Sequence, residues 1–218
     1  MFHSRGRFAL FAGIALAGAV PLLAQDAMQK PGAPDPARVT AGTYQVDSDH
    51  TLIRFEVDHF GITPYFGIFG DISGTLTLDP ANISAARGEI TIPIGKVTTA
   101  SAGLTAHLLR PAEAGGKPDF FGADPAPARF VITSVTPDDD DRDEARIAGD
   151  LTLNGVTRPV TLEAKFYGAG KAPKDMGGKE MVGFEAETKI RRSDFGINMT
   201  IPMVSDEVEL DIVAAFIK

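Results

Sequence analysis

From Thr43 to the end of the chain, apolar and polar residues alternate along the sequence. In 52–58, the side chains of Ile53, Phe55 and Val57 fall on one face of an extended chain, and charged residues fall on the other. This period of two predicts a β-strand with one buried face and one solvated face. The same alternation predicts further strands in 72–78, 90–94, 147–153, 160–166, 182–190 and 208–216.

Turn residues separate the predicted strands. Asn154-Gly155 carries the signature of a two-residue type I′ hairpin, and 79–82 (DPAN) is typical of another tight connection. The acidic run 138–141 and the stretch 170–180 are polar and lack periodicity, so we expect longer solvated loops there.

One stretch favours a helix. Ser101 is a good N-cap residue, Leu104 and Leu108 lie four apart on one helical face, and Pro111 cannot continue a helix. We therefore expect one short helix over 101–110.

The body of the chain is predicted to be all-β, a single antiparallel domain of about eight or nine strands with this helix. No change of composition divides it, and it contains no internal repeat. Two architectures suit strands with one apolar face: a sandwich filled by its own side chains, or a closed barrel that can hold a small ligand. The periodicity alone does not choose between them.

The first segment is predicted to be an export signal. Residues 1–24 have a positive start and then an uncharged run that is short for a membrane span of about 20 residues. We expect cleavage near Ala24 and no stable membrane span afterwards, with an uncleaved anchor as the alternative. Residues 25–42 contain prolines and no apolar periodicity, which predicts a flexible leader before a domain over 43–218.

Composition excludes several functions. The chain has 29 acidic and 21 basic side chains, a net charge of −8, so its surface repels nucleic acid. Cysteine is absent, which excludes disulfides, thiolate metal sites and cysteine nucleophiles. The chain has 14 Phe, 3 Tyr and no Trp, so few of its aromatic side chains can form hydrogen bonds, which indicates an apolar interior.

The inventory of catalytic and metal-binding motifs is thin. Three histidines follow the signal, His50, His59 and His107, and none stands in an HxH or HExxH spacing. The chain has no G-x-S-x-G elbow, P-loop or G-x-G-x-x-G sequence. We expect no catalytic site, no metal site and no cofactor.

Phenylalanines gather instead in Gly- and Pro-rich stretches, which we expect to be flexible connections. Phe60, Tyr65, Phe66 and Phe69 crowd the segment HFGITPYFGIFG, and 120–121 adds two more rings after the predicted helix. Each ring by itself is explained by core packing. Together they favour a mouth or lining that accepts an elongated apolar ligand.

Several motifs match a known family over 43–218. The most specific are GDLTLNGVTRPVTL at 149–162, RRSDFGIN at 191–198 and SDEVELDI at 205–212, supported by HLLRPAEAGGKPDFF at 107–121. With these motifs in this order, the chain resembles the YceI-like proteins, secreted bacterial lipocalin-like barrels that bind polyisoprenoid lipids.

The resemblance implies an antiparallel eight-stranded lipocalin-like barrel that binds, transports or stores an isoprenoid lipid, a polyprenyl chain or a quinone, in the periplasm. The apolar strand faces would line its interior: Ile53, Phe55, Val57, Leu76, Ile90, Ile92, Leu162, Phe184, Ile190 and Leu210. The mouth and a helical lid would come from Phe60, Phe66, Phe69, Leu108, Phe120 and Phe130.

Other functions stay open at this point. The chain is either this carrier, an enzyme that uses His50, His107 or Asp194 as acid or base on such a lipid, or a solid-core stress or adhesion module. Arg191, Arg192 and Asp194 have two interpretations, as contacts to a lipid head or as an ion pair and turn that fix a hairpin. A homodimer is also open.

Overall fold

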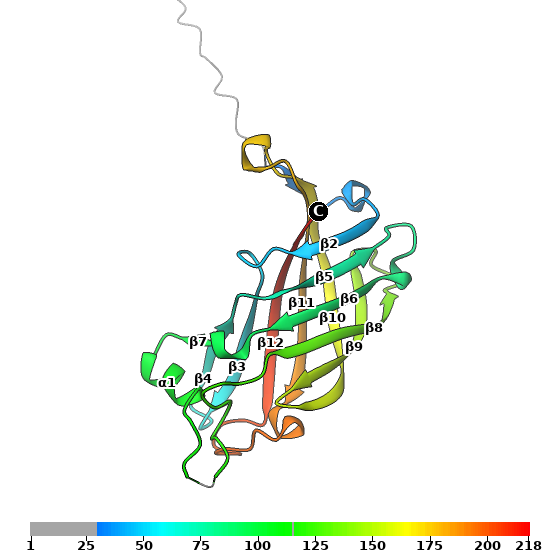
Figure 1. Cartoon of the computed structure of the whole chain (residues 1–218). Helices are drawn as coiled ribbons and strands as arrows, with labels where there is room; N and C mark the ends of the chain where they lie inside the picture. The colour runs from blue at the N-terminus through cyan, green and yellow to red at the C-terminus, as the bar shows by residue number, and fades with distance from the viewer. Residues whose placement is uncertain (1–29, 115) are drawn as a thin grey trace, which may run out of the picture.

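A computed structural model describes residues 30–114 and 116–218 (Figure 1). The predicted signal peptide, 1–24, lies outside the described residues. Within them, no helix is long and apolar enough to cross a membrane. The strands are β1 (Gly32–Ala33), β2 (Gly42–Val46), β3 (Leu52–His59), β4 (Thr63–Phe69), β5 (Ser73–Leu78), β6 (Arg87–Ile92), β7 (Thr98–Thr99), β8 (Ala128–Pro137), β9 (Glu144–Leu153), β10 (Val156–Lys171), β11 (Glu180–Arg191) and β12 (Glu207–Ile217). The helices are α1 (Ala102–Leu108) and the 3-10 turns η1 (Pro36–Arg38), η2 (Ile83–Ala85), η3 (Ile94–Lys96), η4 (Lys174–Met176) and η5 (Arg192–Phe195).

The sheet closes into a barrel. Its eight-stranded ring runs β2, β5, β6, β8, β9, β10, β11 and β12, and β12 pairs again with β2. Every pairing is antiparallel. The prediction of an all-β antiparallel eight-stranded barrel is confirmed, and of the two architectures left open it is the closed one.

The wall is extended at one end by three further strands. β3 pairs with β12 beyond the point where β2 leaves it, β4 pairs with β3, and β7 pairs with β4. The helix α1 follows β7 and lies at this end, at the lower left of Figure 1 and away from the C terminus. The barrel therefore has two distinct ends, the α1 end and the end where β1 and the C terminus lie.

The predicted turn and helix signals are confirmed. Asn154 and Gly155 have φ values of 52° and 75°, the positive pair that a type I′ turn requires. The Ser101 hydroxyl accepts a hydrogen bond from the Leu104 N–H at 3.3 Å, so Ser101 caps α1.

The segment 60–69, which we expected to be a flexible connection, is mostly the strand β4. Its glycine at position 67 marks a close approach between strands. A Cβ on Gly67 would lie 2.6 Å from the Thr98 carbonyl oxygen and 2.7 Å from the Phe55 ring. The glycine is therefore explained by packing in a sheet and not by loop mobility.

The described part of the predicted leader, 30–42, is also ordered against the barrel. β1 pairs with the end of β10, where Gly32 lies opposite Gly170. The Asp35 carboxylate then caps η1 by accepting from the Ala37 N–H at 3.0 Å. Pro36 stands in the first turn of η1, where proline fits well. Of the prolines that suggest a linker, Pro36 lies in η1, and Pro31 and Pro34 flank β1.

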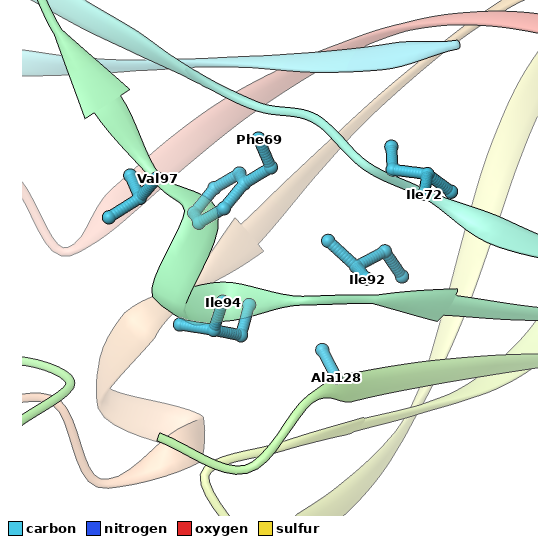
Figure 2. Packing of buried hydrophobic residues seen from close by; sticks show 6 residues of the cluster. All are labelled: Phe69, Ile72, Ile92, Ile94, Val97 and Ala128. Atoms are coloured by element: carbon cyan, nitrogen blue, oxygen red, sulfur yellow. The ribbon is translucent and has the colours of Figure 1, made fainter. Parts of the chain in front are cut away.

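The α1 end of the barrel is filled by its own side chains. Phe55 and Phe121 pack against Phe69, with ring centroids 5.5 Å and 6.0 Å away. Leu108 of α1 packs onto the same group. We call the buried cluster at this end the plug, and Figure 2 shows its side chains converging from neighbouring strands and η3. Its members are Phe69, Ile72, Ile92, Ile94, Val97 and Ala128.

Arg192 holds the connection between β11 and β12 at the same end. Its side chain is 5% exposed and donates hydrogen bonds to the backbone oxygens of Ser205, Ile197 and Val204, at 2.8, 3.0 and 2.7 Å. The guanidinium thus satisfies carbonyls of a segment that forms no strand. Arg192 acts as a structural clamp.

We expect Arg192→Ala to lower the melting temperature by about 6–12 °C. Leaving buried carbonyls without donors costs about 3 kcal/mol, and each kcal/mol is worth about 2–4 °C in a domain of this size. Thermal unfolding followed by circular dichroism measures the shift. The control is Arg191→Ala, since Arg191 is exposed and such substitutions cost at most about 0.5 kcal/mol. Equal melting temperatures for the two variants would contradict the clamp.

Candidate functional site

Beyond the plug, the barrel interior contains an apolar cavity of about 1070 Å³. This volume is at the upper limit of the range of about 300–1,000 Å³ that is usual for ligand sites. Every strand of the closed ring contributes side chains to its wall. The predicted lining residues that border it are Ile53, Leu76, Ile90, Ile92, Leu162, Phe184 and Leu210. Phe130, which was predicted for the mouth and lid, also borders the cavity.

Small side chains create the space. Ala145, Ala164 and Ala186 stand opposite one another on β9, β10 and β11, and all three border the cavity. Larger residues at these inward positions would fill the barrel. These alanines are not among the predicted lining residues, because only bulky apolar side chains were expected to line the interior. Alanine at matched inward positions of three successive strands is the signal that would have identified them.

The cavity wall carries little polarity. Thr51 is the one polar side chain among the described lining residues away from the opening, and its hydroxyl is engaged by Ala215. It donates to the Ala215 carbonyl at 3.1 Å and accepts from the Ala215 N–H at 3.0 Å. The interior therefore offers contact area and no unused hydrogen-bonding group of its own.

The cavity opens at the end opposite the plug, which we call the mouth. Three connections form it: the η1 region, the β5–β6 turn with η2, and the β8–β9 loop. Its residues are Asp35, Pro36, Ala37, Val39, Pro80, Ala81, Asn82, Ile83, Ser84, Pro137, Asp138, Arg142, Asp143 and Glu144.

The predicted mouth with a helical lid is wrong in its position. Phe69 belongs to the plug, and Phe55 and Leu108 pack on it, so the α1 end is closed. Phe120 is half-buried beside His107 at 5.3 Å between ring centroids, also at this end. The Phe-rich segments lie at the packed end of the barrel, because large aromatic rings fill its interior there.

Four other predicted residues also lie away from the cavity. Phe66 is 55% exposed on the outer face of β4, where the Arg54 guanidinium lies 5.4 Å from its ring centroid. Phe60 is 51% exposed in the β3–β4 turn with φ at 63°. Val57 and Ile190 are half-buried in the plug-side half of β3 and β11.

Comparison with known proteins identifies the fold. The YceI-like domain model matches residues 44–216. The chain belongs to the YceI-like domain family. Protein YceI of Escherichia coli O17:K52:H18 is 43% identical over 173 residues, which cover 78% of this chain and 84% of that protein.

Solved structures share the barrel of this YceI-like chain. A Campylobacter jejuni YceI protein is 29% identical with a TM-score of 0.60, covering 74% of this chain and 89% of the other. A polyisoprenoid binding domain from Saccharophagus degradans, implicated in plant cell wall breakdown, is 13% identical with a TM-score of 0.53. That match covers 80% of this chain and 97% of the other, and at this identity it shows the shared fold.

The histidines of the YceI-like barrel lie outside its cavity. The Nδ1 atom of His50 is 2.8 Å from the Asp47 carboxylate, and the Nε2 atom of His107 is 2.9 Å from the Asp119 carboxylate. None of these four residues borders the cavity. Within the described residues, no group of three or more His, Asp or Glu side chains converges as a metal site.

The arginines and the aspartate considered as head contacts are far from the mouth. Arg191 and Asp194 are exposed at the plug end, and Arg192 is committed to backbone carbonyls there. The hairpin-fixing interpretation fits Arg192, although its partners are carbonyl oxygens and not the carboxylate of an ion pair.

We expect Ala186→Phe to weaken binding of any ligand in the cavity by at least tenfold while the protein stays folded. The new ring would occupy space that the alanine row leaves open, so it needs no displacement of packed side chains. The matched control is Glu187→Phe, because Glu187 is the next residue and points outward. Equal affinities for a hydrophobic fluorescent probe in both variants would place the binding site elsewhere.

Proposed function

We propose that this chain binds an isoprenoid lipid, a polyprenyl chain or a quinone, inside its barrel and carries or stores it in the periplasm. The observation that carries the proposal is the large apolar cavity with one opening. An isoprenoid tail has no hydrogen-bonding groups, so a wall without unused polar groups suits it. The structural relative described as a polyisoprenoid binding domain supports the choice of ligand class.

The arrangement of the two ends supports tail-first entry. The plug closes the α1 end with packed side chains, whereas the mouth is made of connections. Each 100 Å² of tail surface removed from water contributes about 2.5 kcal/mol. A lipid therefore gains most when its tail reaches the plug and its head stays at the mouth.

The periplasmic location rests on the export signal predicted over residues 1–24. A periplasmic location suits a lipid-binding barrel, because a water-insoluble lipid needs a carrier to cross an aqueous compartment. The net charge of −8 supports a barrel that stays soluble while it holds such cargo.

We expect affinity for linear prenols to rise with chain length and to level off near seven five-carbon units. At about 30 Å³ for each water-sized group, the cavity of about 1070 Å³ holds on the order of 35 such groups. Competition against a bound fluorescent probe measures the series, and mass spectrometry of an organic extract of the exported protein identifies its natural cargo. No binding at any length, together with an extract free of lipid, would refute the proposed function.

We further propose that the chain is a binding protein and not an enzyme. His50 and His107 are paired with carboxylates outside the cavity, and Asp194 is exposed at the plug end. None of these groups reaches a lipid held inside the barrel, so none is placed to transfer a proton to it.

His50→Ala and His107→Ala should each leave the dissociation constant for a prenol within about threefold of the original. The reason is that neither imidazole borders the cavity. Titration with the same prenol measures both variants beside Ala186→Phe, which is expected to lose binding. The enzyme hypothesis predicts instead a product of the bound lipid whose formation falls about a hundredfold in one histidine variant, and mass spectrometry after incubation detects it.

A further inference from the structure

The mouth is strongly acidic. Asp35, Asp138, Asp143 and Glu144 border the opening, and Arg142 is the basic residue among the described lining residues. The β8–β9 loop supplies most of this charge, because its sequence from position 138 to 144 is DDDDRDE. The head of a lipid whose tail fills the cavity has to lie beside these side chains.

The β8–β9 loop is held against the edge of the cavity by a hydrogen bond from β10 and by hydrogen bonds within the loop. The Phe166 N–H donates to the Asp143 carbonyl oxygen at 2.6 Å, and Phe166 itself lines the cavity. The Asp138 carboxylate accepts from the Asp140 and Asp141 N–H groups at 2.8 and 3.2 Å. These bonds favour the ionised carboxylate, so the pKa of Asp138 is lowered. The acidic rim, which comprises Asp35, Asp138, Asp143 and Glu144, thus has a defined position at the opening.

Basic groups near the rim offset only part of this charge. Lys165 Nζ lies 2.9 Å from the Glu144 carboxylate, and Arg38 Nε lies 3.7 Å from that of Asp35. Each of these cations is already paired with a rim acid. Asp138 and Asp143 have no ion-pair partner within the described residues, whereas Arg142 is the one unpaired cation among the described lining residues, so net negative charge remains at the opening.

We propose that this acidic rim determines head specificity, so that the barrel accepts isoprenoid lipids with an uncharged head and rejects those that carry phosphate. The proposal rests on the proposed function, since it assumes an isoprenoid tail in the cavity. A phosphate or diphosphate at the mouth meets several carboxylates at short range, and Arg142 is the one basic residue among the described lining residues that could contact it. An alcohol or quinone head carries no charge and meets no such repulsion.

Two ligands with one tail test the rim. Geranylgeraniol and geranylgeranyl diphosphate share a 20-carbon chain, so the ratio of their dissociation constants reports the head alone. We expect the alcohol to bind at least tenfold more tightly at low salt. The ratio should shrink at 0.5 M salt, where the screening length falls from about 8 Å at physiological salt to a few ångströms.

Neutralising the rim should raise affinity for the diphosphate selectively. The rim variant combines Asp35→Asn, Asp143→Asn and Glu144→Gln. In it we expect the dissociation constant of the diphosphate to fall at least threefold and that of the alcohol to change less than twofold. Asp35→Asn keeps the oxygen that caps η1. The control combines Asp58→Asn, Glu187→Gln and Glu209→Gln, which change net charge equally but lie away from the mouth, and it should leave the ratio unaltered.

The outcomes separate the two proposals. If the diphosphate binds as tightly as the alcohol, or if the control changes the ratio as much as the rim variant, the rim does not set specificity and this inference is overturned. If neither ligand binds to the folded protein, the proposed function itself fails. A ratio that falls only in the rim variant supports the inference.

Discussion

The structure depends on how side-chain size is distributed along the barrel axis. At the α1 end, the Phe69 ring centroid lies 5.5 Å from that of Phe55 and 6.0 Å from that of Phe121, and these rings fill the interior there. Further along, the matched alanines of β9, β10 and β11 leave the interior unfilled. A closed ring cannot narrow to bring its walls together, because its width is set by strand number and stagger. The unequal filling therefore produces a cavity with one floor and one mouth.

Strand faces, turns and helix caps in this fold could be predicted well from the sequence, because each depends on residues close together in the chain. Alternation of apolar and polar residues shows which side chains share a strand face. The turn at Asn154-Gly155 needs only two residues with positive φ. Ser101 caps α1 by accepting from an N–H only three residues further along the chain. Closure has a different origin. It requires β12 to pair with β11 on one side and with β2 and β3 on the other, across most of the chain. Periodicity is the same in a sandwich, so the motif resemblance, not the pattern, pointed to a barrel.

The site was only partly predictable for a related reason. Inward positions such as Leu162 and Phe184 were identified correctly as facing the interior, since the face follows from the period of two. Distance along the barrel axis does not follow from it. Phenylalanines therefore suggested a mouth where the structure has a plug, and the outward Phe66 was included because its strand was taken for a loop. The alanine row becomes meaningful only once the register of three strands is known.

Under the proposed function, the lipid head would be recognised by the segments that show no periodic pattern. Because the plug closes one end of the barrel, only the other end could hold the polar head of such a lipid. That end is built from η1, the β5–β6 turn and the β8–β9 loop, which carry no periodicity and which the sequence predicts to be part of a leader, a tight turn and a solvated loop. Strands tolerate few changes without losing closure, whereas these connections can change charge while the cavity persists. On the two proposals made above, strand side chains would set how long a tail the cavity holds and the loops at the mouth would set which head it accepts, so these two properties could vary independently.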